Sequence, residues 1–338
     1  MSNGVSEMFV DQMESHVGCA IESPQCVVTV DKGTLVWLEQ LQSALQSTCP
    51  IGRGKKKLSM APHARVRRAQ KLAALLEGMA LSEVIERVRL GKSDPHIACL
   101  DRALPSILED KSMTEHMSSG AALTLAMEIL DELMVEYGSW FGRSKIDNAR
   151  RERERACGAL VKRMLAFKRR YRKLMVIRLD VGYGKQYAAH IDPSHEILDH
   201  WSDLLDAIKE DFETSFLGYA AKIEYGVRKG PHMHLMLLFN GSKVRQDVTI
   251  ARLIGELWKN KVTKGAGLYH NCNEPTYKAR FTHCGVGVFC GLDDATIAGF
   301  QRVADYLVKR ELLVRVAMPH LGRALRTGLV LPHAHHQH

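Results

Sequence analysis

The sequence predicts an α+β protein, in which an N-terminal helical region precedes an antiparallel sheet of about five strands covered by helices. Three observations predict this class. From residue 62 to residue 171, apolar side chains recur at helical spacing almost throughout. At Lys173 the period of the pattern changes from 3.6 to 2. Beyond that point, short apolar runs bounded by turn residues alternate with amphipathic segments, as expected where helices pack on an antiparallel sheet.

The composition favours an intracellular protein with an anionic partner. The 338 residues include 47 Lys and Arg against 38 Asp and Glu, and the net charge of +9 favours nucleic acid. The eight cysteines form no Cys-x-x-Cys pair, which favours reduced thiols in a cytoplasm. The sequence shows no secretory pattern and no apolar run of about 18 residues. We therefore expect a cytoplasmic protein that neither is secreted nor spans a membrane.

The same patterns predict four parts of the chain, with boundaries where periodicity is lost or changes. They are an N-terminal arm and linker (1–60), a helical domain (61–172), a sheet domain (173–315) and a C-terminal tail (316–338).

In the first two parts, helices are predicted at 34–47 and 121–137. Further helix starts are indicated by Asp94-Pro95 and by the capping-box pattern Ser112-x-x-Glu115. Basic residues gather on two helix surfaces, which are either solvated faces or contacts with a DNA backbone. They are Arg65, Arg67, Arg68 and Lys71 on one helix, and Lys162, Arg163, Arg169, Arg170, Arg172 and Lys173 at the end of another.

The sheet domain is predicted to alternate between strands and helices, with the helices covering one side and the other face open. The predicted strands are 174–181, 219–227, 230–241, 267–272 and 281–290, and the predicted helices are 197–216, 247–259 and 293–313.

The strand at 230–241 carries the first candidate site. Its sequence, GPHMHLMLLFNG, is an apolar run between Gly-Pro and Asn-Gly, which is typical of a buried strand. Because side chains alternate along a strand, His232 and His234 point to the same face. Neutral imidazole is the commonest metal ligand, so the pair predicts a metal site. The alternative is a pair of hydrogen-bonded core histidines.

A third metal ligand is expected from the preceding strand, where Glu224 is the available carboxylate. A three-residue hairpin loop at 228–230 would pair Glu224 with His234 and put all three polar groups on one face. A two-residue loop would turn Glu224 to the other face. Asp180 is the second choice of ligand, with a salt bridge or a turn as its other roles. The mixture of imidazole and carboxylate suits Mg²⁺ or Mn²⁺ better than a thiolate-selecting metal.

The last predicted helix carries a candidate nucleophile. Tyr306 lies at the edge of the apolar stripe of that helix, and Lys309 follows on the same side. The alternative is an ordinary boundary tyrosine beside a surface pair of Asp305 and Lys309. Among the nine tyrosines, the competitors fall in predicted loops or strands: Tyr183, Tyr187 and Tyr269.

These residues resemble the HUH endonuclease superfamily, and more narrowly the rolling-circle replication initiators of prophages and inoviruses. The resemblance covers roughly residues 170–312 and nothing N-terminal of them. It is carried by LMVIRLDV (174–181), Glu224, PHMHLMLLFNG (231–241), IGELWK (254–259), Asn-Glu-Pro (273–275), GVGVFCGLDD (285–294) and ADYLVK (304–309).

The resemblance implies an HUH-type sheet and a metal-dependent nicking enzyme. An ion on Glu224, His232 and His234 would polarise a DNA phosphate, and Tyr306 would attack it while Lys309 offsets the developing charge. The product would be a 5′-phosphotyrosine and a free 3′-hydroxyl at a single-stranded origin, and host replication proteins would extend that end. DNA contacts are expected from Arg178, Arg228, Lys229, Arg302 and Arg310.

Other functions stay open at this point. Because Arg302 and Arg310 occupy the positions four residues either side of Tyr306, the enzyme would use one tyrosine. A plasmid relaxase or a single-strand transposase would share the same chemistry. A basic DNA-binding regulator with a vestigial site belongs to a different class.

Overall fold

The computed structural model describes residues 30–48, 61–109, 111–188, 195–309 and 312–329. The chain divides into two compact units, Thr29–Glu152 and a second unit that contains Arg153–His338, and each is described by itself. The fold class is the predicted α+β, with helices and an antiparallel sheet. Within the described ranges, no helix is both long enough and apolar enough to cross a bilayer.

The first unit is helical, and local sequence signals explain several of its helix ends. Asp94 caps α5 by accepting hydrogen bonds from the backbone N–H groups of His96 and Ile97. The predicted start at Ser112 is wrong, because Ser118 caps the long helix instead. The helices are α2 (Lys32–Thr48), α3 (Pro62–Leu76), α4 (Leu81–Gly91), α5 (Pro95–Leu108), α6 (Ser119–Gly138) and the start of α7 (Trp140–Arg170).

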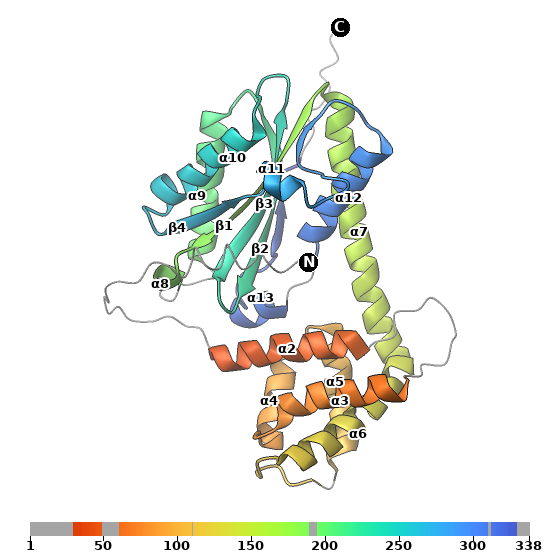
Figure 1. The fold of residues 1–338 in the computed structure, drawn as a ribbon. Coiled ribbons are helices and arrows are strands. Elements are labelled where there is room, and N and C mark those ends of the chain that lie inside the picture. Colours follow the sequence, from red (N-terminus) through yellow and green to blue (C-terminus); the bar gives the residue numbers. More distant parts are fainter. Residues whose placement is uncertain (1–29, 49–60, 110, 189–194, 310–311, 330–338) are drawn as a thin grey trace. The chain divides into compact units, whose positions relative to one another are not determined.

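Along the chain, the boundary between the two units falls within helix α7, between Glu152 and Arg153. Met164 and Phe167, in the second half of α7, are fully buried in the apolar core that the sheet forms. The periodicity of the sequence changes only at Lys173, because a helix that packs on a sheet keeps its helical period. The C-terminal half of α7 therefore belongs structurally to the sheet unit (Figure 1).

The second unit is built on a six-stranded sheet with the order β4-β1-β3-β2-β6, in which β5 also pairs with β1. Each pairing is antiparallel, and β1 lies between β3 on one side and β4 and β5 on the other. The strands are β1 (Leu174–Tyr183), β2 (Phe216–Gly226), β3 (Gly230–Asn240), β4 (Gly267–Asn271), β5 (Gly287–Phe289) and β6 (Leu325–Thr327).

Helices cover both faces of this sheet, so the expectation of one open face is wrong (Figure 1). On one face, Trp201 of α9 contacts Tyr219 at 5.0 Å between ring centroids. On the other face, Phe300 of α12 packs with Met236 and Leu238. The histidines lie on this second face, on the same side of β3 as Met236 and Leu238. The remaining helices are α8 (Lys185–Ala188), α9 (Glu196–Asp211), α10 (Asp247–Glu256), the π-helical η1 (Leu257–Val262), α11 (Pro275–Lys278), α12 (Asp294–Leu307) and α13 (Leu312–Ala317).

Several predicted boundaries near the C-terminus are wrong. The last predicted helix ends at Leu307 and is followed by the separate helix α13, whose apolar residues are buried. The predicted strand at 281–290 shrinks to β5. Part of the predicted tail forms strand β6, which pairs with residues 220–222 of β2. The histidine-rich end of the chain lies outside the described residues.

Candidate metal and tyrosine site

The hairpin of β2 and β3 places the three predicted ligands on one face. The connecting loop has three residues, but it spans residues 227–229, so Glu224 pairs with His232 and not with His234. Gly230 has a φ of 67° and begins β3 immediately after the loop. The predicted pairing is thus wrong by two residues, and because side chains alternate with a period of two, the shared face is kept.

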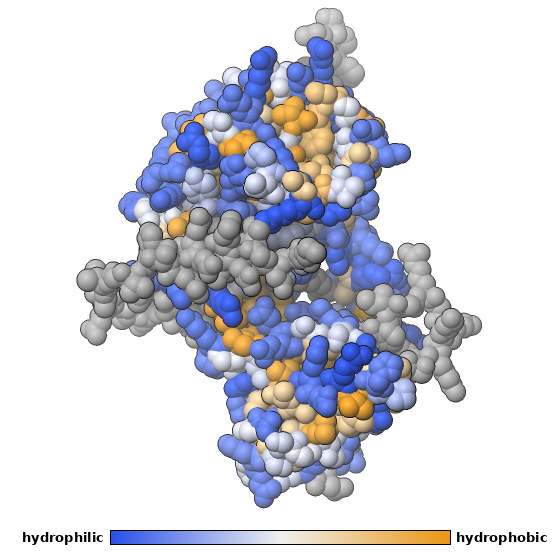
Figure 2. All heavy atoms as spheres, in the orientation of Figure 1, coloured by the Kyte–Doolittle hydropathy of each residue, from blue (hydrophilic) through white to orange (hydrophobic). Residues whose placement is uncertain are grey.

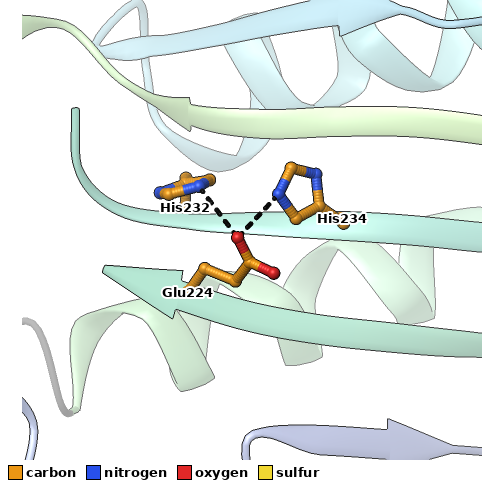
Figure 3. Close-up of side chains that lie close together, drawn as sticks. All are labelled: Glu224, His232 and His234. Carbon is orange, nitrogen blue, oxygen red and sulfur yellow. Dashed lines mark hydrogen bonds and ion pairs between the residues drawn. The ribbon is translucent and has the colours of Figure 1, made fainter. Parts of the chain in front are cut away.

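The two imidazoles are anchored through Nδ1 and present Nε2 to the carboxylate (Figure 3). His232 Nδ1 lies 3.0 Å from the carbonyl oxygen of Gly230, and His234 Nδ1 lies 2.6 Å from Oδ1 of Asp180. The Nε2 atoms lie 3.7 Å and 3.1 Å from Oε2 of Glu224. An acceptor behind each metal-binding imidazole is the usual arrangement in metalloproteins, because it fixes the orientation of the ring.

Glu224, His232 and His234 form a group that could bind a metal ion. One ligand atom from each residue lies within 4.8 Å of the other two. Ligand atoms about 2.1 Å from a shared ion lie roughly 3 to 4 Å apart, so the Nε2–Oε2 separations fit a common ion. Both histidines are buried and the Glu224 side chain is only 12% exposed. Asp180 faces Nδ1 of His234, so its position is behind this ligand and not in the same ligand set.

Without an ion, opposite charges hold this group together. Burial alone would lower the pKa of His234, but the carboxylates of Asp180 and Glu224 on either side raise it to about 9. Burial would likewise raise the pKa values of the two carboxyl groups, but the His234 imidazolium holds both below their ordinary values, assisted at Asp180 by Arg178. At neutral pH the metal-free site therefore contains an imidazolium between two carboxylates.

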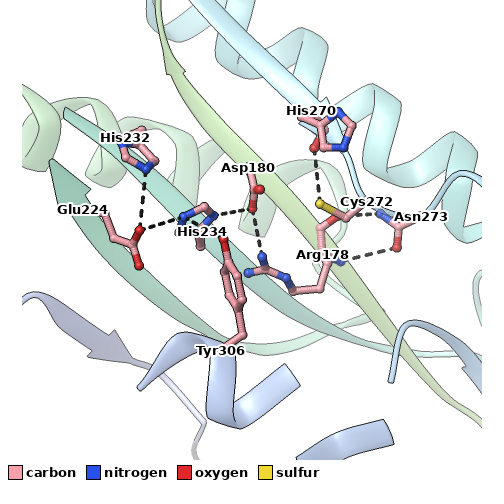
Figure 4. A network of polar contacts seen from close by, with 9 residues as sticks. All are labelled: Arg178, Asp180, Glu224, His232, His234, His270, Cys272, Asn273 and Tyr306. Carbon is pink, nitrogen blue, oxygen red and sulfur yellow. Dashed lines mark hydrogen bonds and ion pairs between the residues drawn. The ribbon is translucent and has the colours of Figure 1, made fainter. Parts of the chain in front are cut away.

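Tyr306 reaches this group from α12. Its hydroxyl oxygen lies 3.2 Å from Nε2 of His234, although the residue as a whole is 44% exposed (Figure 4). The guanidinium of Arg178 lies 4.8 Å from the centre of the Tyr306 ring. Burial, and then the charge of Asp180, raise the pKa of the phenol, whereas Arg178 opposes that rise. The Tyr306 hydroxyl thus lies beside the histidine pair, and the phenol is neutral when no ion is bound.

The backbone of Arg178 is held by Asn273, which belongs to the Asn-Glu-Pro stretch but had no predicted role. The Asn273 side chain donates a hydrogen bond to the Arg178 carbonyl at 2.7 Å and accepts one from its N–H at 3.3 Å. Asn273 lies just beyond the end of β4, so its side chain replaces backbone pairing on that side of β1. Arg178 in turn donates to Asp180 at 3.0 Å. Asn273, in the Asn-Glu-Pro stretch, therefore has a structural role, because it binds the backbone of β1 at Arg178.

A row of polar side chains crosses the sheet at the level of His234. Asp180 pairs with His234 on one side and with His270 on the other, and Lys222 pairs with His234 from β2. Lys222 is buried, with 7% of its surface exposed. Sequence reasoning missed His270, because the pairing of distant strands is not encoded locally. It also missed Lys222, although strand alternation puts Lys222 on the same face as Glu224. Because side chains alternate along a strand, His270 could have been placed on this face once β4 was known to pair with β1.

The other predicted residues have separate positions. Arg228 and Lys229 lie in the β2–β3 loop, and Arg302 is exposed on α12. Lys309 is exposed and follows the end of α12, so it does not continue the helix as predicted. Arg310 lies outside the described residues.

The competing tyrosines have their hydroxyls engaged elsewhere. Tyr183 lies 2.9 Å from His200 Nδ1, Tyr187 donates to Glu196 at 3.0 Å, and Tyr269 donates to Glu256 at 2.7 Å.

Comparison of the chain with protein-family models, with curated proteins and with solved structures gives no match.

Proposed function

We propose that this protein is a single-tyrosine HUH-type DNA endonuclease that starts rolling-circle replication. The observation that carries this proposal is the position of the Tyr306 hydroxyl, 3.2 Å from Nε2 of His234, within a group that could hold a metal ion. A nucleophile beside a divalent-ion site is the arrangement that metal-assisted phosphoryl transfer requires. The resemblance in sequence around the same residues supports the choice of DNA as the substrate.

Glu224, His232 and His234 would hold Mg²⁺ or Mn²⁺, which would polarise the scissile phosphate and offset its charge. The Tyr306 oxygen would form a bond to phosphorus as its proton passes to solvent. The bond from phosphorus to the 3′ oxygen would break, and that oxygen would take up a proton as the free 3′-hydroxyl. The buried guanidinium of Arg178, held over the ring, would favour the phenolate that this attack requires.

In this proposal the nicked strand provides the primer, and host replication proteins extend its 3′ end. Three basic residues, Arg228, Lys229 and Arg302, would hold the single strand, as would Arg310, which lies outside the described residues. The expectation that Arg178 contacts DNA is not kept, because its side chain is buried against Tyr306 and Asp180. Lys309 would assist by offsetting charge on the phosphate.

The proposal is tested by incubating the protein with a single-stranded DNA library and Mn²⁺, denaturing it, and sequencing the strands that remain covalently attached. We expect a defined set of sequences from the wild type. None should be recovered when Mn²⁺ is replaced by a chelator or with the His232→Ala variant. The matched control is His200→Ala, which removes a histidine that contacts Tyr183 on the other face and should leave attachment intact. Strands recovered equally with and without the ion would contradict a metal-dependent nicking enzyme.

A further inference from the structure

The segment from the start of α11 to the start of α12 combines aromatic rings with positive charge. Residues 275–292 contain Lys278 and Arg280 but no Asp or Glu. Lys278 is paired with Asp247, whereas the Arg280 side chain is exposed. Helix α11 lies in front of the sheet in Figure 1, and Figure 2 shows hydrophobic and hydrophilic residues interleaved on this face of the unit. An acid-free segment of this kind favours an anionic partner over a basic one.

Five side chains here form what we call the aromatic-basic strip: His270, Tyr277, Phe281, Arg280 and Arg302. Their ring centroids follow one another at 5.8 Å from His270 to Tyr277 and at 5.3 Å from Tyr277 to Phe281. Arg280 lies 5.2 Å from the Tyr277 ring, and Arg302 lies 5.3 Å from the Phe281 ring. The rings are half-buried and the two arginines are exposed. The strip therefore has two exposed, planar guanidinium groups, each of which lies close to an aromatic ring.

The strip borders the candidate site at both of its ends. Arg302 precedes Tyr306 by one turn of α12, so the two side chains share a face of that helix. At the other end, His270 pairs with Asp180, the residue behind His234. A polymer bound along the strip would thus pass beside the Tyr306 hydroxyl.

We propose that the aromatic-basic strip binds the unpaired bases of single-stranded DNA on one side of the phosphate that Tyr306 attacks. This inference rests on the proposed function and adds the path of the substrate to it. Guanidinium planes and aromatic rings stack on bases of any identity, and the positive charge pairs with the phosphates. Duplex DNA would not fit this surface, because its bases are already stacked on one another. The strip thus gives the enzyme a preference for single strands that does not depend on sequence.

The test measures binding in the absence of divalent ions, so that cleavage does not occur. A fluorescently labelled oligothymidine is compared by anisotropy with an abasic strand of equal length, which has the same phosphates but no bases. Loss of a stacking contact costs roughly five- to a hundredfold in affinity. We expect Arg302→Lys, which keeps the charge and loses the plane, to weaken binding of oligothymidine within that range and to leave the abasic strand unchanged. Phe281→Ala should act in the same direction.

The matched control is Arg252→Lys, the same change at an exposed arginine of α10, which packs on the opposite face of the sheet. It should leave both affinities unchanged, and thermal melting should show that all variants are folded. Equal affinities of wild type and Arg302→Lys for oligothymidine would overturn the inference, as would a loss of the same size on both strands. Formation of the covalent adduct by the wild type with Mn²⁺ is measured separately. If the wild type forms the adduct but the variants bind oligothymidine as the wild type does, the role of the strip is refuted and the proposed function is not. If the wild type forms no adduct, the proposed function is refuted.

Discussion

At the scale of single residues, His234 connects every part of the candidate site. Its Nε2 faces Glu224 and Tyr306, and its Nδ1 faces Asp180. The shared face of the two histidines and Glu224 could be predicted, because it follows from strand periodicity. The role of Asp180 could not, because it depends on which atom of the imidazole the carboxylate meets. Its position opposite Nδ1 is known only once β1 and β3 are paired.

Asp180 should therefore set metal affinity without being a ligand. Asp180→Asn removes the negative charge behind His234 and should lower Mn²⁺ affinity about 10- to 100-fold, as loss of such a partner does in other metal sites. Isothermal titration calorimetry measures the change directly. Asp206→Asn, at an exposed carboxylate paired with Lys209, is the control and should bind Mn²⁺ as the wild type does. A wild-type affinity in Asp180→Asn would show that the contact with His234 has no influence on the site.

The metal-free protein should lose stability as pH rises from neutral. The pKa of His234 is raised from 6.5 to about 9, so its contribution is complete below pH 6.5 and is lost as pH rises through about 9. Thermal melts in a chelator should show a fall in Tm over this window that is absent in His234→Gln. The same proton must leave before an ion can bind, so Mn²⁺ affinity should rise over the same window. If the Tm of the wild type and the Tm of His234→Gln changed with pH in the same way, His234 would not be an imidazolium between two carboxylates.

At the scale of the elements, the approach of α12 to the segment before β5 depends on two glycines, Gly299 and Gly285. A Cβ at Gly299 would lie 2.7 Å from the carbonyl oxygen of Cys284, and a Cβ at Gly285 would lie 2.1 Å from the carbonyl oxygen of Gly299. Both approaches are closer than a side chain allows. Tyr306 is on the same helix, so its distance from His234 depends on this contact.

Gly299→Ala should accordingly destabilise the protein by about 1 to 3 kcal/mol and slow adduct formation. Alanine is otherwise the better helix former, by about 1 kcal/mol, so the sign of the change is diagnostic. Gly158→Ala in α7 is the control, because that helical glycine is exposed and has no atom within 4 Å of an added Cβ. It should stabilise slightly. Urea denaturation of both variants gives the free energies of unfolding, and stabilisation by Gly299→Ala would show that α12 does not need this close approach.

The elements themselves were predictable where local signals are strong. The hairpin, the fold class and α12 up to Leu307 follow from periodicity and turn residues. The end of that helix does not, because the apolar residues of α13 continue beyond it, and their burial as a separate helix is decided by tertiary packing. Strand β6 is equally hidden, since its three residues acquire strand structure only by pairing with β2.

At the scale of the whole molecule, the two units have separate cores and can be assigned separate tasks. The candidate site lies entirely in the sheet unit. In the helical unit, Arg65 is paired with Asp131, while Arg67 and Lys71 are exposed on α3. The contribution of such residues to DNA binding depends on salt, because they release counterions from the phosphates.

A protein lacking residues 1–152 should still form the covalent adduct with a single-stranded oligonucleotide. It should bind duplex origin DNA more weakly, with a flatter dependence of affinity on salt concentration. Titrations at several salt concentrations measure both quantities. If the affinity and the salt slope for duplex DNA were the same with and without the helical unit, that unit would have no part in binding DNA.

The central claim is that Tyr306 attacks a DNA phosphate beside the Glu224, His232 and His234 group. It is tested most directly by digesting the covalent adduct with protease and nuclease and locating the attached nucleotide by mass spectrometry. We predict one modified peptide, with the 5′ phosphate on Tyr306, and no adduct from Tyr306→Phe, which should keep its Tm and its Mn²⁺ affinity. Attachment at another residue, for example Tyr277 in the neighbouring strip, or an adduct that persists in Tyr306→Phe, would contradict the account.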